Sequence, residues 1–441
     1  MVKTFRGGFH IPEHKAAAQR EIEEIVPPAF VYIPLSQHIG KAAEPVVSVG
    51  DHVDRGQLIA DVTEGLGVPV HASVSGKVVS VDVVKVATGN SVGRITIEND
   101  YKNTLSPEIK DCEVRFRDLT PEYVIEKVRR AGISGMGGAG FPTYAKMKSA
   151  LGRIDTMIIN AVECEPYITA DHRLLLEKTE EWFDGVKILL KVFDLPGAVV
   201  AIEDNKPDAI DCLERLAEET GLLDIHVLKT KYPQGDERQI IRVITGREIP
   251  AGKLPADVKC VVFNAETVHA IGNAVVHNLP LFERVVTVSG DCVSPSHNFL
   301  VPIGTSYRDL LNACGELIRE PEKIICGGPM MGIAQWDLSL SVTKTTNALL
   351  FFSHKKMPIL VERPSCIRCG RCADACPIHL LPNYLMQFSR AEDLDRCEQF
   401  GVRSCIECGT CAFLCPARIP LVQYMRMAKA KLRERDQKNG H

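Results

Sequence analysis

Two near-identical runs of sequence, CIRCGRCADACP at 366–377 and CIECGTCAFLCP at 405–416, determine how the last quarter of the chain must fold. Each run has the spacing Cys-x-x-Cys-x-x-Cys-x-x-x-Cys-Pro. Three thiolates on one tight loop can bind three corners of a cubane cluster, and Gly370 and Gly409 let the backbone approach it closely. The runs therefore predict a small α-helical unit built around two iron–sulfur clusters.

The two runs are expected to exchange one ligand each, because in two-cluster ferredoxins the fourth cysteine of a run binds the other cluster. The first predicted [4Fe-4S] cluster is held by Cys366, Cys369, Cys372 and Cys415. The second is held by Cys405, Cys408, Cys411 and Cys376. Zinc knuckles or structural thiols are the alternative, but zinc is usually bound by two separated pairs of ligands.

Bulk properties limit the classes of function. The chain has 441 residues, enough for about three or four domains at roughly 150 residues each. A net charge of −4 argues against nucleic acid as the main partner. Sixteen cysteines are unusual for a cytosolic chain unless they bind metal. The start MVKTFRGGFH lacks the apolar core of a secretory signal, and no apolar run reaches the ~20 residues of a membrane span. We expect a soluble protein that could lie on a membrane through its partners.

The other cysteines and the basic C-terminal tail have simple structural explanations. Cys397 lies between the two runs but outside their spacing, so we expect a buried apolar thiol there. The same state is expected for Cys112, Cys212, Cys260, Cys292, Cys314 and Cys326. The predicted last helix, PLVQYMRMAKAKLRERD, is rich in Lys and Arg. It is either a solvated helix end or a docking surface for an acidic or membrane-bound partner.

The order of predicted elements divides the chain into four units. Residues 1–112 are predicted to be all-β, with the valine-rich stretches VVSVGDHVDRGQLIADV (46–62) and VHASVSGKVVSVDVV (70–84). These stretches resemble a lipoyl/biotinyl-type β-sandwich. Carrier domains of that type place a lysine in the hairpin between such halves, whereas residues 61–71 contain none. We therefore expect the sandwich to be a scaffold.

Residues 113–283 predict an α/β unit with a mainly parallel sheet, because strand and helix patterns alternate. A first helix begins after the N-cap Thr120, with Pro121 at its first position. The expected strands are 156–162, 198–204 and 225–230, and the expected helices are 171–193 and 207–219. Residues 284–345 resemble a small β-grasp domain of the SLBB type, with no ligand assigned. Residues 346–441 form the two-cluster helical unit.

A glycine-rich loop, GISGMGGAGFPTYAKM at 132–147, lies within the α/β unit. It contains Gly135-x-Gly137-x-x-Gly140, a pattern that lets backbone amides reach a phosphate, and Lys146 could add positive charge. Glycine clusters also form ordinary turns, and no clear strand precedes this one as the dinucleotide fingerprint requires. The pattern alone is weak evidence for a nucleotide.

Four segments together resemble the flavin-binding, NADH-oxidising 51-kDa subunit family of respiratory complex I. They are GMGGAGFPTYAK, NAVECEPYITADHR (160–173), YPQGDERQII (232–241) and FNAETVHAI (263–271). The resemblance implies an FMN site lined by Gly135, Gly137, Gly138, Gly140, Lys146, Asn160, Glu163, Asp236 and Asn264. It further implies that Phe141, Glu165 and Glu237 face the nicotinamide coenzyme. The chain departs from that family at Val162, Cys164 and Asp236. Without the resemblance, Glu163 and Glu165 could equally be solvated charges on a surface loop.

The order of the four units resembles the C subunit of the Rnf electron-transport complex over nearly the whole chain. That resemblance implies an oxidoreductase subunit that exchanges electrons between NAD(H), FMN and two [4Fe-4S] clusters. It implies membrane and redox partner subunits, a ferredoxin-linked electron partner, and a peripheral position on the cytoplasmic side of the membrane. Hydride transfer needs no acid–base residue, and we identify no catalytic side chain. The alternatives are a soluble electron donor to a cobalamin or proline reductase, and a relay that no longer binds NADH.

Overall fold

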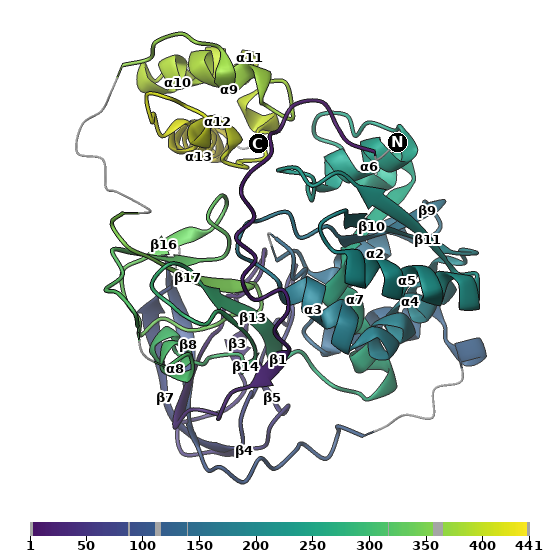
Figure 1. Ribbon diagram of the computed structural model, residues 1–441. Helices are drawn as coiled ribbons and strands as arrows, with labels where there is room; N and C mark the ends of the chain where they lie inside the picture. Colours follow the sequence, from purple (N-terminus) through teal and green to yellow (C-terminus); the bar gives the residue numbers. More distant parts are fainter. Residues whose placement is uncertain are drawn as a thin grey trace.

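The computed structural model describes residues 3–86, 89–110, 116–138, 140–315, 317–355 and 365–438, and it contains four folded units (Figure 1). Along the chain these are a β-sandwich, an α/β unit, a β-grasp unit and a helical unit. This order confirms the fold class predicted from the sequence. The predicted border at residue 112, and Cys112 itself, lie outside the described residues.

The sandwich packs two small antiparallel sheets around an apolar core. One sheet has the strand order β2-β8-β7-β4 and the other β3-β5-β6. Alternate side chains point inward, so that Val31, Ile59 and Ile95 are fully buried. The strands are β2 (Phe30–Pro34), β3 (Glu44–Pro45), β4 (His52–Val53), β5 (Leu58–Asp61), β6 (Val70–His71), β7 (Gly76–Lys85) and β8 (Ser91–Asn99).

Residues 3–25, which the sequence assigns to the sandwich, instead cross the other three units, and we call them the N-terminal strap. In Figure 1 this purple segment passes the helical unit and descends to β1 (Ile22–Glu24). The N–H of Gly8 donates to the carbonyl of Ala375 at 2.9 Å, and Phe9 pairs with Tyr232. Strand β1 pairs in parallel with the β-grasp sheet. The strap therefore holds separate units against one another.

The α/β unit is a four-stranded parallel sheet with the order β11-β10-β9-β12. Thr120 caps the first helix as predicted, since its side chain accepts from the N–H of Tyr123 at 3.3 Å. The strands are β9 (Thr156–Ala161), β10 (Ala198–Glu203), β11 (Leu223–Leu228) and β12 (Cys260–Asn264). The helices are η1 (Phe116–Asp118), α1 (Pro121–Arg130), α2 (Thr143–Ala150), α3 (Ala170–Glu177), α4 (Thr179–Phe193), α5 (Pro207–Thr220), α6 (Glu237–Thr245), η2 (Pro255–Val258) and α7 (Ala265–Val276). Strand β12, which was not predicted from the sequence, is only five residues long.

The β-grasp unit is a six-stranded sheet of order β1-β14-β13-β17-β15-β16 with one helix. Its elements are β13 (Glu283–Ser289), β14 (His297–Pro302), α8 (Tyr307–Ala313), β15 (Lys323–Cys326), β16 (Ile333–Gln335) and β17 (Ala348–Phe352). Strand β17 belongs to this unit although it lies beyond the predicted border at 345. It pairs with both β13 and β15, and its five side chains are buried. A buried ion pair between Arg284 and Glu266 joins this sheet to α7.

The helical unit contains α9 (Arg371–Asp374), α10 (Pro382–Arg390), α11 (Leu394–Gln399), η3 (Val402–Ser404), α12 (Thr410–Phe413) and α13 (Leu421–Lys438). Cys397 is fully buried in its apolar core, as predicted. Much of the basic tail is paired within the unit. Arg426 and Lys429 contact Glu407, and Arg435 contacts Asp395 and Glu398. Among the described residues, no helix is long and apolar enough to cross a membrane.

Candidate functional site

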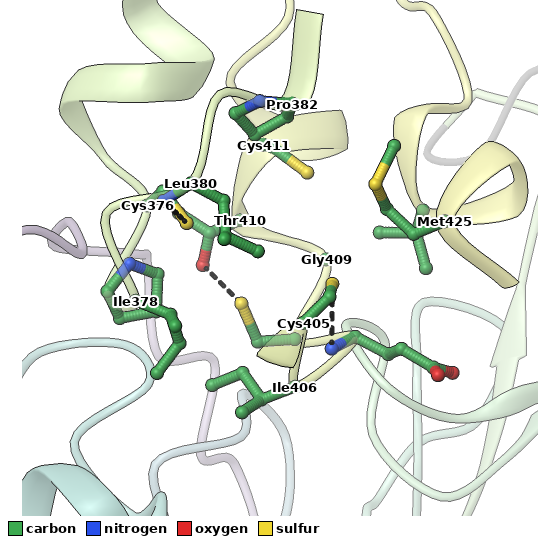
Figure 2. Close-up of a pocket in the computed structure, with 14 residues that line it drawn as sticks. Cys376, Ile378, Leu380, Pro382, Cys405, Ile406, Gly409, Thr410, Cys411 and Met425 are labelled. Atoms are coloured by element: carbon green, nitrogen blue, oxygen red, sulfur yellow. Dashed lines mark hydrogen bonds between the residues drawn. The ribbon is translucent and has the colours of Figure 1, made fainter. Parts of the chain in front are cut away.

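The eight cysteines of the twin runs line two separate cavities in the sets predicted from their spacing. One cavity is lined by Cys376, Cys405, Cys408 and Cys411, and the other by Cys366, Cys369, Cys372 and Cys415. Figure 2 shows the sulfur atoms of Cys376, Cys405 and Cys411 around the first of these. In both cases the fourth cysteine comes from the opposite run.

The loops that carry the cysteines fit a cubane cluster in three respects. Both turn through left-handed residues at matching places, with φ of +57° at Arg368 and Glu407. Backbone N–H groups point at sulfur, since Arg368 donates to Cys366 and Glu407 donates to Cys405, each at 3.4 Å. In addition, the four cysteines of each set line one shared space, as a four-cornered cluster requires.

A third and much larger cavity, of ≈ 570 Å³, lies beside the carboxyl ends of β9 and β12. Ligands usually bind at this end of the strands of an open parallel sheet. All twelve residues predicted to contact FMN or the nicotinamide coenzyme line this cavity, which are Gly135, Gly137, Gly138, Gly140, Phe141, Lys146, Asn160, Glu163, Glu165, Asp236, Glu237 and Asn264. Four segments far apart in the sequence thus contribute to one site of nucleotide size.

The glycine loop connects α1 to α2 and packs on the N-terminus of α7. The N–H of Gly135 donates to the carbonyl of Phe141 at 2.9 Å, and the N–H of Met136 donates to Thr267 Oγ1 at 3.0 Å. A Cβ at Gly137 would lie 2.9 Å from Asn264, so only glycine permits this approach. Lys146, in the first turn of α2, donates to the carbonyl of Val262 at 3.0 Å. Gly137, Gly138 and Lys146 line the cavity, so the loop brings glycine backbone and one amine to it, which suits the phosphate of FMN.

Replacing Gly137 with alanine is expected to weaken FMN binding by roughly tenfold, since overpacking of this kind typically costs ~1–3 kcal/mol. The added methyl would displace the loop from Asn264. Quenching of flavin fluorescence on titration with the apoprotein measures the dissociation constant. Lys148→Ala, on the exposed face of α2, is the control and should bind FMN as the wild type does. An unchanged affinity in Gly137→Ala would place the flavin elsewhere.

The carboxylates Glu163 and Glu165 are not solvated surface charges, so that alternative is wrong. The Glu163 side chain is only 5% exposed and accepts from the N–H groups of Asp171, at 2.7 Å, and His172, at 3.4 Å. It therefore caps the start of α3. Glu165 accepts from two N–H groups of the β-grasp unit, and burial raises the pKa of its carboxyl to about 7. Lys15 of the strap donates to the carbonyls of both residues.

Asp171 is a cavity residue that the sequence reasoning missed. Its carboxylate accepts from Asn264 Nδ2 at 2.6 Å, and it lines the cavity beside the glycine loop. Burial, together with the nearby carboxylates of Glu163 and Glu266, raises its pKa well above the ordinary range. Val162, one of the positions where the chain departs from the complex I family, packs in an apolar core and does not line the cavity. Asp171 lies within the segment 160–173 that signals the site, but nothing local shows that it faces the ligand.

The segment 232–241 closes the other side of the cavity. Asp236 caps α6 by accepting from the N–H groups of Arg238 and Gln239, each at 3.2 Å, and burial raises its pKa to about 6. Asn160 Nδ2 donates to the carbonyl of Gly235 at 2.9 Å. These bonds hold the end of β9 against the start of α6, and so fix the width of the cavity.

The flavin-type cavity and the second cluster cavity share a wall. Ile406 and Cys408, from the second cysteine run, line the large cavity, while Cys408 also lines the cluster cavity. Tyr232 lies between them, fully buried, and its hydroxyl donates to the carbonyl of Cys408 at 2.7 Å. No sequence pattern indicated this contact, because Tyr232 and Cys408 belong to segments with no local relation.

Family models match the chain in the same order as the four units. They are described as RnfC Barrel sandwich hybrid domain (residues 3–102), Nuo51 FMN-binding domain (128–273), SLBB domain (285–334) and 4Fe-4S dicluster domain (365–419). The cavities and these domains define a flavin and iron–sulfur electron-transfer protein, with sites for FMN and two [4Fe-4S] clusters. The fold agrees with a solved NAD⁺-reducing [NiFe]-hydrogenase, with a TM-score of 0.54 and 18% identity over 75% of this chain and 68% of that one.

The chain belongs to the family of C subunits of ion-translocating oxidoreductase complexes, the Rnf complexes. The C subunit of the Na⁺-translocating ferredoxin:NAD⁺ oxidoreductase complex of Acetobacterium woodii is 38% identical over 397 residues, covering 90% of this chain and 89% of that protein. The corresponding protein of the proton-translocating complex of Clostridium ljungdahlii is 42% identical, covering 87% and 84%. The C subunit from Vibrio cholerae is 40% identical over 98% of this chain, which spans 56% of that relative's length.

Proposed function

We propose that this chain exchanges electrons between NAD(H), FMN and two [4Fe-4S] clusters, as the peripheral NADH-binding part of an Rnf-type ferredoxin:NAD oxidoreductase. One observation carries the proposal: the cavity built around the glycine loop also contains Cys408 of the second cluster set. A flavin accepts a hydride and passes on single electrons, which is the conversion needed between NADH and iron–sulfur clusters. The names of the relatives, which specify ferredoxin and NAD⁺, agree with both ends of this path.

The residues of the large cavity have distinct proposed roles. Gly135, Gly137 and Lys146 hold the phosphate end of FMN, because all three line the cavity and Lys146 supplies a positive charge. Phe141, which is 38% exposed, offers a ring face for stacking at the cavity mouth. Glu165 and Glu237 accept hydrogen bonds from the coenzyme. None of these side chains transfers a proton in hydride exchange, so the chain contributes orientation and exclusion of water.

The two clusters occupy different places on the proposed path. Cys376, Cys405, Cys408 and Cys411 would hold the cluster next to the flavin cavity, and that cluster would exchange single electrons with the flavin. The other cluster is nearer the surface, since Cys369 is exposed and Ile367 beside it is 66% exposed. We propose that Cys366, Cys369, Cys372 and Cys415 would hold this outer cluster, which would exchange electrons with the redox and membrane subunits of the complex. We further propose that the chain lies on the cytoplasmic side of the membrane, bound through those partners.

Anaerobic reconstitution of the full chain tests the proposal. About eight irons and one flavin per chain are expected when both cubanes are filled. NADH should bleach the flavin and then support reduction of a one-electron dye. If the filled protein leaves the flavin oxidised in excess NADH, it is a relay that does not use the coenzyme. If NADH reduces the flavin but the protein does not co-purify with membrane subunits from its own cells, the protein is a soluble donor to another reductase.

A further inference from the structure

The β-grasp unit forms part of the wall of the coenzyme cavity. Met331, from the loop Gly327–Gly332, and Asn347, just before β17, line the same cavity as the glycine loop. We propose that the loop Gly327–Gly332 positions Glu165 for the nicotinamide coenzyme, which makes the β-grasp unit a working part of the coenzyme site. The inference rests on the proposed function, and it assigns a ligand to this unit: the carboxylate of the chain's own Glu165.

Two consecutive backbone N–H groups hold the Glu165 carboxylate. Met330 N–H donates to Glu165 Oε2 at 3.1 Å, and Met331 N–H donates to Oε1 at 2.9 Å. Each carboxylate oxygen therefore has its own donor, and the plane of the carboxylate is fixed. Such paired amides form a small anion-binding nest, and bonds to a charged acceptor are about twice as strong as neutral ones. The remaining lone pairs of the two oxygens can accept from a ligand in the cavity.

The packing of Gly328 shows that the loop is shaped for this carboxylate. A Cβ at Gly328 would clash with Glu165 Oε2 and with its Cδ atom. The backbone of Gly328 does not have a positive φ, so its conformation does not require glycine. Glycine is required because Glu165 occupies the space that a side chain would need. Lys15 of the N-terminal strap donates to the backbone carbonyl of Glu165 at 3.2 Å. The main chain of Glu165 is thus held by the strap and its side chain by the loop of the β-grasp unit.

The same loop also contacts the second cysteine run, which lines the cluster cavity nearer the flavin cavity. A Cβ at Gly409 would lie 2.7 Å from the carbonyl oxygen of Met330, so the second cysteine run packs directly on this loop. Met330 packs in one apolar group with Tyr232 and Cys408. A single turn of the β-grasp unit therefore contacts both the Glu165 carboxylate and the second cysteine run. A spacer would need neither contact.

Three variants of the full chain, reconstituted anaerobically with FMN and iron–sulfur clusters, test the inference. Gly328→Ala pushes the carboxylate out of its nest, Glu165→Gln removes its charge, and the third variant combines the two. Rapid-mixing measurements of flavin bleaching at several NADH concentrations separate coenzyme affinity from the limiting rate. Iron content and FMN affinity report whether the variants fold. Ile333→Ala, on exposed β16 just after the loop, is the control.

We expect both single variants to weaken NADH binding by roughly tenfold, the effect of losing charge-assisted hydrogen bonds, with normal iron and FMN content. The double variant should bind NADH no less tightly than the single variant with the lower affinity, because the two changes act through one contact. A Gly328→Ala protein that binds NADH as the wild type does, or a double variant with additive losses, would overturn the inference alone. A wild-type protein that NADH does not bleach would overturn the proposed function as well.

Discussion

Replacing Cys411 with alanine is expected to reduce the iron content from about eight to about four per chain, while NADH still bleaches the flavin. Cys411 lines the cluster cavity next to the flavin cavity but does not line the flavin cavity itself. Removing this thiolate takes one corner from the second cluster. The four cysteines of the first set remain in place, so that cluster should still form.

The consequence for electron flow is larger than the consequence for composition. Without the second cluster, electrons on the flavin have no adjacent carrier, and NADH-dependent dye reduction should fall to near background. Iron analysis, electron paramagnetic resonance of the reduced protein and the dye assay measure these effects together. Cys397→Ala is the matched control, because Cys397 is buried in the same unit but lines neither cluster cavity. Full dye reduction by Cys411→Ala would show that the flavin reaches the surface without this cluster.

Substituting Lys344 with methionine is expected to change stability in a strongly pH-dependent way. Lys344 is fully buried where three units meet, and its amine donates to the carbonyls of Pro69, at 2.6 Å, and Gly132, at 2.7 Å. Burial lowers its pKa from 10.5 to about 7. His71 and His38 lie close to this amine. Burial first, and then the charge of Lys344, lower the pKa of both imidazoles, that of His71 to about 3. Their titration therefore falls below the pH range in which Lys344 loses its proton.

The direction in which stability changes with pH follows from the number of protons that the folded and unfolded chains bind. Below pH 7 both the folded and unfolded chains carry the proton, so the folded protein bears the cost of a buried charge. Between pH 7 and pH 10 the unfolded chain still carries it while the folded chain has lost it, so stability rises with pH. Relative to Lys344→Met, the wild type should gain roughly 4 kcal/mol over this range. Urea denaturation of both proteins at several pH values measures the difference. A difference that stays constant from pH 6 to pH 10 would mean that the buried amine does not titrate there.

Prediction from the sequence was most successful where the chemistry is local. The spacing of the cysteines allowed their division into two sets, because three ligands of each cluster must lie on one short loop. The cap at Thr120 was predicted for a similar reason, because a helix cap depends on a few adjacent residues. The resemblance of four segments to one flavin-binding family then indicated twelve residues that the fold places around a single cavity.

Prediction was least successful where distant segments meet. The N-terminal strap, residues 3–25, carries no pattern that separates it from the sandwich, because the strand and bridges that place it are backbone pairs with distant segments. Strand β17 follows a loop of polar residues, and only the gap in the β-grasp sheet makes it part of that unit. Asp171 was missed because its hydrogen-bond partner, Asn264, lies in a different segment.

The amino-acid sequence by itself determines which cofactors this protein can bind, because thiolate spacing and a glycine-rich turn are properties of a few adjacent residues. How those parts work together depends on the packed fold. Packing places Cys408 on the wall of the flavin cavity and sets Met330 and Met331 against Glu165. The physical reason is that electron transfer and coenzyme binding depend on distances between groups that the chain separates by many residues. Those distances are fixed only when the apolar cores of the four units, and the strap across them, are packed.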